Sequence, residues 1–145
     1  MNAASELKVI VDMDVVLRGP DGEVKDRRLV HNTVTTAGKD GIADQVLASP
    51  SLVKMGWMAI GTGSPSGTAL GTEISRVAFS SKTRSGAVVT NVASWGAGVG
   101  TGAITEAGTF DQVSVGGNMW MSASFAVINK LAADTLSITW TLTIS

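Results

Sequence analysis

The final segment of the chain constrains the fold more than any other feature. From residue 135 to residue 144, large apolar residues alternate with serine or threonine at every position. Alternation with a period of two over this length is typical of a β-strand that buries one face. A helix would spread the same apolar side chains around its circumference. We therefore expect Leu136, Ile138, Trp140, Leu142 and Ile144 to face a core.

Similar short apolar segments recur along the chain between Gly-rich turns, a pattern typical of sandwiches and barrels. Strands are expected over residues 7–18, 23–32, 56–61, 73–83, 87–95, 103–110, 119–129 and 135–144. Residues 119–127 also alternate, so we expect them to pair with the last strand. The predicted fold is mainly β: an antiparallel β-sandwich of about eight strands with one short helix and an N-terminal β-hairpin.

The hairpin comprises the first two of these segments. Gly19-Pro20-Asp21-Gly22 separates them, and in such a turn Pro presets φ while Gly accepts a positive φ. Residues 1–32 are interpreted as a hairpin or arm that is part of the same domain as the body, residues 33–145.

One helix is expected, from Thr35 to Leu47. Thr35 and Thr36 provide hydroxyl groups that can cap its first turn, and Pro50 closes it. Gly38 and Gly41 each weaken a helix by up to about 1 kcal/mol relative to Ala. Four apolar residues have helical spacing: Ile42, Ala43, Val46 and Leu47. The helix should therefore be short and held by packing.

Composition argues against several classes of protein. The chain has no Cys, so a disulfide scaffold, a thiolate metal site and a catalytic Cys are excluded. A net charge of -1 provides no basic face for nucleic acid. The first residues do not resemble a secretory signal, and no apolar run of about 20 residues is present. We expect no nucleic-acid or membrane partner, and synthesis in a reducing cytosol.

The charged residues are unevenly distributed. Fourteen of the 23 lie in residues 1–44, which leaves nine for the remaining 101 positions. An ordinary soluble domain is about 25% charged. The surface of the body must therefore be mostly Ser, Thr, Gly and Ala, which suits packing against neighbours because interface cores are depleted in charge. The alternative is a small β-domain that exposes Ser and Thr to water.

Candidates for chemistry are few. His31 is the one side chain with a reference pKa near neutrality, but no Gly-x-Ser-x-Gly segment accompanies it. Asp12 and Asp14 share a strand face without the rest of a hard-cation loop. Three later carboxyl groups have no separation fixed by the sequence for paired glycosidase chemistry: Glu73, Glu106 and Asp111. No catalytic, metal or cofactor-binding residue is predicted.

The glycine clusters and the tryptophans have structural interpretations. Residues 61–63 and 96–102 lack the Lys-Ser/Thr pair and the following helix of a phosphate-binding loop. We interpret them as tight turns, the second with the alternative of an arm that orders against a neighbour. Trp140 is assigned to the core. Trp120 has the opposite parity from Met119 and Met121, so it either faces outward as an interface anchor or packs into a second layer.

Several strings occur in a recognisable order and spacing. They are His31-Asn32-Thr33-Val34-Thr35-Thr36-Ala37-Gly38, Met58-Ala59-Ile60-Gly61-Thr62-Gly63, Ala69-Leu70-Gly71-Thr72-Glu73-Ile74-Ser75-Arg76, Ile104-Thr105-Glu106-Ala107-Gly108-Thr109-Phe110-Asp111 and the closing strand. Together they resemble a family of small virion proteins of tailed bacteriophages, called head decoration (capsid cement) or tail and head fibre proteins. The resemblance covers residues 30–145. It implies a β-sandwich with no enzyme activity and no cofactor in a multimeric setting.

From this resemblance we expect a decoration protein on the outer surface of a phage head, made in the bacterial cytoplasm. Its partners would be the major capsid protein and copies of itself, with a trimer as the first expectation. The alternative is a tail or head fibre adaptor; a third reading is a glycan-binding module or small hydrolase. The N-terminal hairpin would clamp the shell by adding a strand to a neighbour. Expected contact residues are Val9, Val11, Arg27, Arg28, Trp95, Gly98, Gly100 and Trp120.

Overall fold

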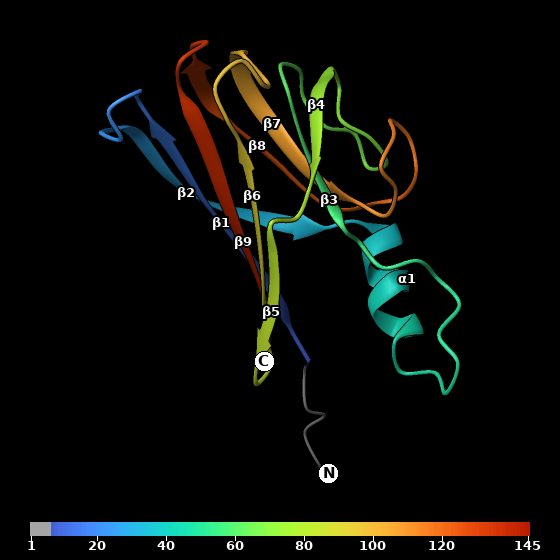
Figure 1. Cartoon of the computed structure of the whole chain (residues 1–145). Helices are drawn as coiled ribbons and strands as arrows, with labels where there is room; N and C mark the ends of the chain where they lie inside the picture. Colours follow the sequence, from blue (N-terminus) through green and yellow to red (C-terminus); the bar gives the residue numbers. More distant parts are fainter. Residues whose placement is uncertain (1–6) are drawn as a thin grey trace.

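The computed structural model describes residues 7–145, which form one curled antiparallel sheet with a helix beside it (Figure 1). The elements are β1 (Val9–Arg18), β2 (Val24–Val34), α1 (Thr36–Asp44), β3 (Trp57–Gly61), β4 (Glu73–Ala78), β5 (Ser81–Ser85), β6 (Val88–Trp95), β7 (Gly102–Phe110), β8 (Met119–Lys130) and β9 (Thr135–Ile144). The strand order is β4-β3-β7-β8-β2-β1-β9-β6-β5. The expected mainly β fold with one short helix and an N-terminal hairpin is confirmed.

The described residues contain nine strands because the segment expected as one strand, residues 73–83, is two. β4 pairs with β3 at one end of the strand order, and β5 pairs with β6 at the other. Between them, Phe79 donates its N–H to Gly56 O (2.9 Å) and Ser80 donates to Val92 O (2.7 Å). This short crossing therefore ties the two halves of the curled sheet together.

The N-terminal hairpin lies in the middle of the strand order. β1 pairs with β2 on one side and with β9 on the other, from Val9 opposite Ile144 to Arg18 opposite Thr135. The predicted pairing of residues 119–127 with the last strand is therefore wrong, because the hairpin separates β8 from β9. β1 has no free edge, whereas residues 24–32 of β2 pair only with β1 among the described residues. Within the hairpin expected to clamp a neighbouring subunit, only β2 has an edge that can pair with a further strand.

The core fills the space between the two halves of the curled sheet. The alternation of the last strand is confirmed, since Leu136, Ile138 and Trp140 are fully buried and Leu142 is 4% exposed. Buried side chains of β1, β6, β3, β7 and β8 belong to the same cluster. Since apolar burial contributes about 25 cal/mol per Å², this cluster is the main stabilising element.

Helix α1 begins where the sequence predicts and ends earlier. The Thr35 hydroxyl accepts the Gly38 N–H at 3.0 Å, and the Thr35 N–H donates to Trp120 O at 2.9 Å. The helix ends at Asp44, so Val46 (87% exposed) and Leu47 (58% exposed) do not join its packing face as expected. No helix among the described residues has the length and apolarity needed to cross a membrane.

The helix packs on β8 through its glycines. A Cβ on Gly38 would lie 2.1 Å from Trp120 O, and one on Gly41 would lie 2.2 Å from the Trp120 ring. The two residues that weaken the isolated helix are therefore the ones that let it approach Trp120. Trp120 packs into this second layer and is 6% exposed, so the outward-facing alternative is wrong.

Gly41→Ala is expected to lower the free energy of unfolding by about 1–3 kcal/mol, because the new methyl group overpacks the Trp120 contact. In an unconstrained helix the same change would stabilise by up to about 1 kcal/mol, so the sign is diagnostic. Urea unfolding followed by circular dichroism measures it. Gly56→Ala is the control, since a Cβ there meets no heavy atom within 4 Å. A more stable Gly41→Ala variant would contradict this packing.

Candidate binding surfaces

Glu106 is fully buried and organises the loop of residues 62–72. Its Oε2 accepts the N–H groups of Gly63 and Thr72, both at 2.8 Å, and its Oε1 accepts the Gly71 N–H at 2.6 Å. The loop is thereby folded over β3 and β7, where Leu70 joins a second apolar cluster. The carboxylate thus serves as a structural anchor for the backbone.

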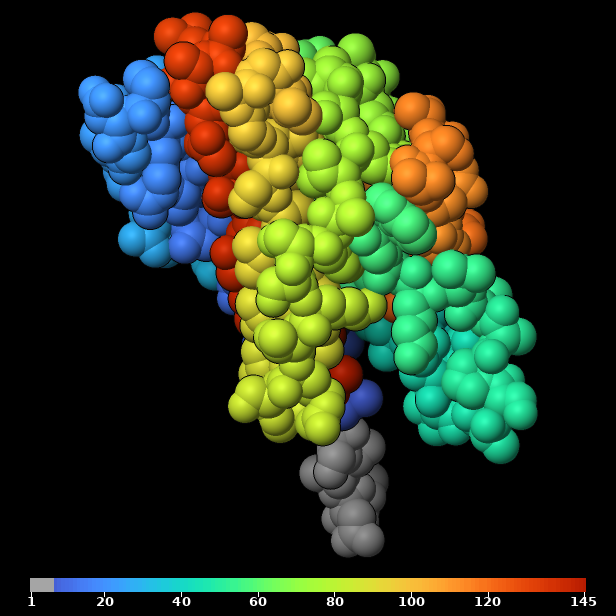
Figure 2. All heavy atoms as spheres, viewed as in Figure 1, coloured from blue at the N-terminus to red at the C-terminus, as the bar shows by residue number. Residues whose placement is uncertain are grey.

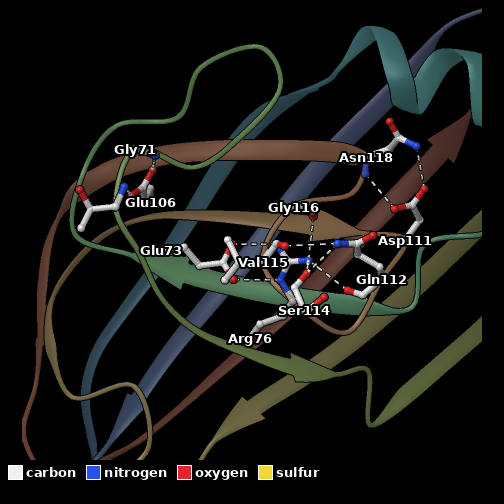
Figure 3. A network of polar contacts seen from close by, with 11 residues as sticks. Gly71, Glu73, Arg76, Glu106, Asp111, Gln112, Ser114, Val115, Gly116 and Asn118 are labelled. Carbon is white, nitrogen blue, oxygen red and sulfur yellow. Dashed lines mark hydrogen bonds and ion pairs between the residues drawn. The ribbon is translucent and has the colours of Figure 1, made fainter.

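Arg76 anchors the loop that follows β7, as Figure 3 shows. Its guanidinium binds Glu73 through two hydrogen bonds of 2.9 and 2.7 Å. Nη1 donates to three backbone carbonyls of that loop, and the group lies 3.7 Å from the centroid of the Phe110 ring. The side chains of Arg76 and Glu73 are only 4% and 10% exposed. The ion pair is therefore part of the packing of this loop.

The third carboxylate considered for paired chemistry also closes a turn. Asp111 accepts two hydrogen bonds from Asn118, from the backbone N–H at 2.8 Å and from Nδ2 at 2.9 Å (Figure 3). Glu73, Glu106 and Asp111 are thus each engaged by neighbouring backbone or side-chain donors. All three lie in the strings that carry the resemblance, and in this structure those strings hold loops in place.

His31 lies on the outer face of the hairpin. Its Nδ1 contacts the Asp12 carboxylate, and Arg27 forms an ion pair with Asp14 at 2.9 Å. Asp12 and Asp14 share one face, as expected, and border a shallow hollow of about 300 Å³ with His31. The His31 side chain is 90% exposed. Residues 7–145 hold no cluster of three His or carboxylate side chains placed to bind a metal ion.

The expected contact residues divide into buried and exposed sets. Trp95 (0% exposed), Val11 (3%) and Trp120 are core residues, so the prediction that they form a contact surface is wrong. Their strand parity or second-layer packing turns them inward. Val9, Gly98 and Arg27 are exposed, whereas Gly100 and Arg28 are half-buried. The exposed residues lie at different places on the sheet and do not form one patch.

The glycine-rich loop of residues 96–102 is fixed to the body. Gly98 donates its N–H to Ala132 O at 2.7 Å, and Lys130 Nζ donates to Gly96 O at 2.9 Å. Gly100 has a φ of 66°, and a Cβ there would lie 2.8 Å from Ile60. The expected alternative of an arm that orders only against a neighbour is wrong, because these contacts are intramolecular.

A partly buried ion pair lies beside this loop. Lys25 of the hairpin binds the Asp134 carboxylate at 2.8 Å, and the side chain of Asp134 is 2% exposed. The hydrogen bond from Lys25 and that from the Leu131 N–H hold the pKa of Asp134 below its ordinary value. Burial lowers the pKa of the neighbouring Lys130 amine, and the charge of Asp134 opposes that shift. The hairpin is thereby joined to the β8–β9 connection.

One outer face of the sheet carries no charge across three strands. The outward residues of β9 face those of β6, and these face those of β5, in direct cross-strand register. One row is Thr141, Thr90 and Thr83, and the next is Thr139, Val92 and Ser81. The remaining members of this uncharged face are Ser137, Thr143, Val88, Ser94 and Ser85. The alternating Ser and Thr of the sequence are thus gathered into one continuous surface.

An apolar cleft of about 470 Å³ lies between α1 and the end of this half of the sheet. Figure 2 shows it as the hollow between β5 and the segment that follows α1. Its apolar lining comprises Ile42, Val46, Met55, Val89, Trp120, Leu142 and Ile144, and its charged lining comprises Lys54, Lys82 and Arg84. Sequence reasoning did not identify this site, because α1, β5 and β9 come together only in the folded chain.

The segment after α1 exposes further apolar side chains. Leu47, Leu52 and Val53 are 46–62% exposed, close to Val46 in sequence. Asp44 holds this segment against the helix, since its carboxylate accepts the N–H groups of Ser51 (3.2 Å) and Leu52 (3.0 Å). The hydrogen bond from Leu52 is the largest cause of the lowered pKa of Asp44. The signal in the sequence for this site was the pair of apolar dipeptides, Val46-Leu47 and Leu52-Val53, on either side of Pro50.

Comparison of the chain with protein-family models, curated proteins and solved structures found no match.

Glu106→Gln is expected to destabilise the protein by about 3 kcal/mol, since hydrogen bonds to a buried charged group are lost and an amide N–H₂ faces backbone donors. Cleavage within residues 62–72 by a nonspecific protease should rise in parallel, because those bonds hold the loop. Denaturant unfolding and limited proteolysis provide the two measurements. Asp40→Asn, an exposed carboxylate on α1, is the control. Unchanged stability and cleavage in Glu106→Gln would contradict the anchoring role.

The Lys25–Asp134 pair should make the free energy of unfolding depend on pH in the acidic range. Because the pKa of Asp134 is lower in the folded protein, the pair stabilises above the ordinary Asp pKa of about 3.9, and this contribution is lost as the pH falls through the folded value. Asp134→Asn should therefore be less stable than the wild type near pH 7, with a smaller difference near about pH 3. Thermal unfolding at both pH values tests this, with Asp21→Asn as the control. A difference that grows toward low pH would overturn the assignment.

Proposed function

We propose that the protein is a structural component of a tailed-bacteriophage particle, a decoration protein bound to the outside of the head. The observation that carries this proposal is the uncharged face of β9, β6 and β5. Interface cores are depleted in charged residues, and a surface without Lys, Glu, Asp or Arg across three strands has that character. The biological setting comes from the resemblance of strings within residues 30–145 to small virion proteins of tailed bacteriophages.

The side chains of the uncharged face lose little conformational entropy when a partner covers them. Ser, Thr and Val are short and hold few rotamers, and β-branched residues are stiff in a strand. Burial of a Lys or Glu side chain would instead cost about 1.5–2 kcal/mol in lost rotamer freedom. A contact of about 1,000 Å² repeated around a shell can therefore stabilise it by adhesion alone.

The loop anchors keep the half of the sheet away from the proposed contact well ordered. Glu106, Arg76 and Asp111 fix the backbone of the loops that cover the other half of the sheet. A rigid surface loses less conformational freedom on binding than a mobile one. The major capsid protein is the proposed partner of the uncharged face.

Binding to purified heads of the phage that encodes the protein tests the proposal. Thr90→Arg places a charge in the middle of the uncharged face and should abolish co-sedimentation with heads that lack the protein. Ala103→Arg adds the same charge on β7, in the other half of the sheet, and should leave binding unchanged. Circular dichroism establishes that both variants fold.

Mass spectrometry of purified particles provides the second measurement. A decoration protein should be present at a copy number comparable with that of the shell protein. A copy number far below it, or recovery with purified tails alone, would overturn the head assignment and favour the fibre adaptor. Binding of Thr90→Arg equal to that of the wild type would exclude the uncharged face as the contact.

A further inference from the structure

The charged residues that line the apolar cleft beside α1 are all positive. Its charged lining residues within the described part of the chain, residues 7–145, are Lys54, Lys82 and Arg84, and no carboxylate of this part lines it. Among residues 7–145, none of the three forms an ion pair. Lys82 Nζ donates to Met55 O at 2.8 Å, and Arg84 Nη1 donates to Gly86 O at 3.0 Å. The cleft is thus apolar inside with unneutralised positive charge at its border.

The cations of the cleft also repel one another. Burial lowers the pKa of Lys82, and the positive charge of Lys54 lowers it further. A carboxylate entering the cleft would remove this repulsion and would bind in a partly desolvated place, where charge pairs are stronger than in water. The chemistry that fits the cleft is therefore an apolar segment that carries carboxylates.

The turn of the β1–β2 hairpin carries two such carboxylates, and Arg18 at its base donates to Gly22 O at 3.2 Å. Asp21 and Glu23 are exposed on it, and neither forms an ion pair among the described residues. The turn is held in shape by Gly19 N–H donating to Glu23 O (2.9 Å) and Asp21 N–H donating to the Glu23 carboxylate (3.1 Å). Val24, 53% exposed, adds an apolar side chain next to them. Because the turn is already folded, it would lose little conformational entropy on entering a cleft.

In Figure 1 the β1–β2 turn lies at the far end of β1 and β9 from α1 and β5, whose residues line the cleft. The turn follows Arg18, which is paired with Thr135 at the start of β9, whereas Ile144 at the end of β9 lines the cleft. At about 3.3 Å per residue, the strands hold the two sites about 30 Å apart. A turn therefore cannot reach the cleft of its own chain, and contact between them must join two copies.

We propose that the apolar cleft of one copy receives the β1–β2 hairpin turn of a second copy, with Asp21 and Glu23 against Lys54, Lys82 and Arg84. The contact is heterologous, because it joins two different surfaces, and it builds a closed ring or an open chain depending on the rotation between copies. It does not depend on the proposed role in a virion. A second copy is the occupant on grounds of charge complementarity and exposed apolar area.

Sedimentation of the full chain with two charge-reversed variants tests the contact. Arg84→Glu alters the cleft and Asp21→Lys alters the turn, and each should weaken self-association about tenfold because a rim attraction becomes a repulsion. Lys39→Glu and Asp40→Lys are the matched controls on the exposed side of α1, outside the cleft lining. Raised salt should weaken association of the wild type, since the Debye length falls to about 3 Å at 1 M.

Mixing the two altered proteins is the decisive measurement. In the mixture, the intact turn of Arg84→Glu meets the intact cleft of Asp21→Lys, so mixed pairs should form with the wild-type affinity, whereas growth beyond pairs depends on the altered turn meeting the altered cleft. A wild-type protein that stays monomeric at high concentration would overturn the proposal and would assign the cleft to another partner. Self-association that is unchanged in either single variant, or a mixture that forms no mixed pairs, would overturn it equally. None of these outcomes would change the interpretation of the head-binding experiment with Thr90→Arg.

Discussion

Burial of the apolar face of β9 is the interaction on which the rest of the structure depends. β9 pairs with β1 on one side and with β6 on the other, so its apolar side chains occupy the middle of one half of the sheet. The opposite half supplies the facing core residues from β3, β7 and β8. Because a strand alternates its faces, burying one side of β9 necessarily places all its Ser and Thr side chains outside. The core and the uncharged face are therefore two consequences of one pattern.

In the loops, which the apolar core does not reach, a few polar side chains hold the backbone in place. Glu106, Arg76 and Asp111 satisfy backbone groups of loops that have no regular partners. Such groups cost free energy when buried unpaired, so one charged side chain that binds several of them orders a long segment. The charged residues of the body are scarce, and several of the few present are used inside the structure. This allocation leaves a large part of the exterior neutral.

Helix α1 shows how residues with low helix propensity can make a tertiary contact possible. Gly38 and Gly41 lower the propensity of α1, and they are also where the helix meets Trp120. That packing leaves Val46 and Leu47 beyond the helix end, and Val46 lines the apolar cleft together with cations from distant parts of the chain. The hairpin joins the same sheet and presents its acidic turn at the opposite end. The molecule thus carries a cleft bordered by cations at one end, a turn with two carboxylates at the other, and an uncharged face on β9, β6 and β5.

The sequence by itself determined the class of fold, the hairpin, the capping of the helix by Thr35 and the inward face of residues 136–142, because these follow from local alternation, turn chemistry and capping. Tertiary structure decided which strands are neighbours: the hairpin separates β8 from β9, and residues 73–85 divide into two strands that serve both halves of the sheet. It also decided that Trp95 and Trp120 are buried and that Lys54, Lys82 and Arg84 border one cleft. Strand order and side-chain convergence depend on long-range burial, and periodicity along the chain carries no information about which distant segments bury one another.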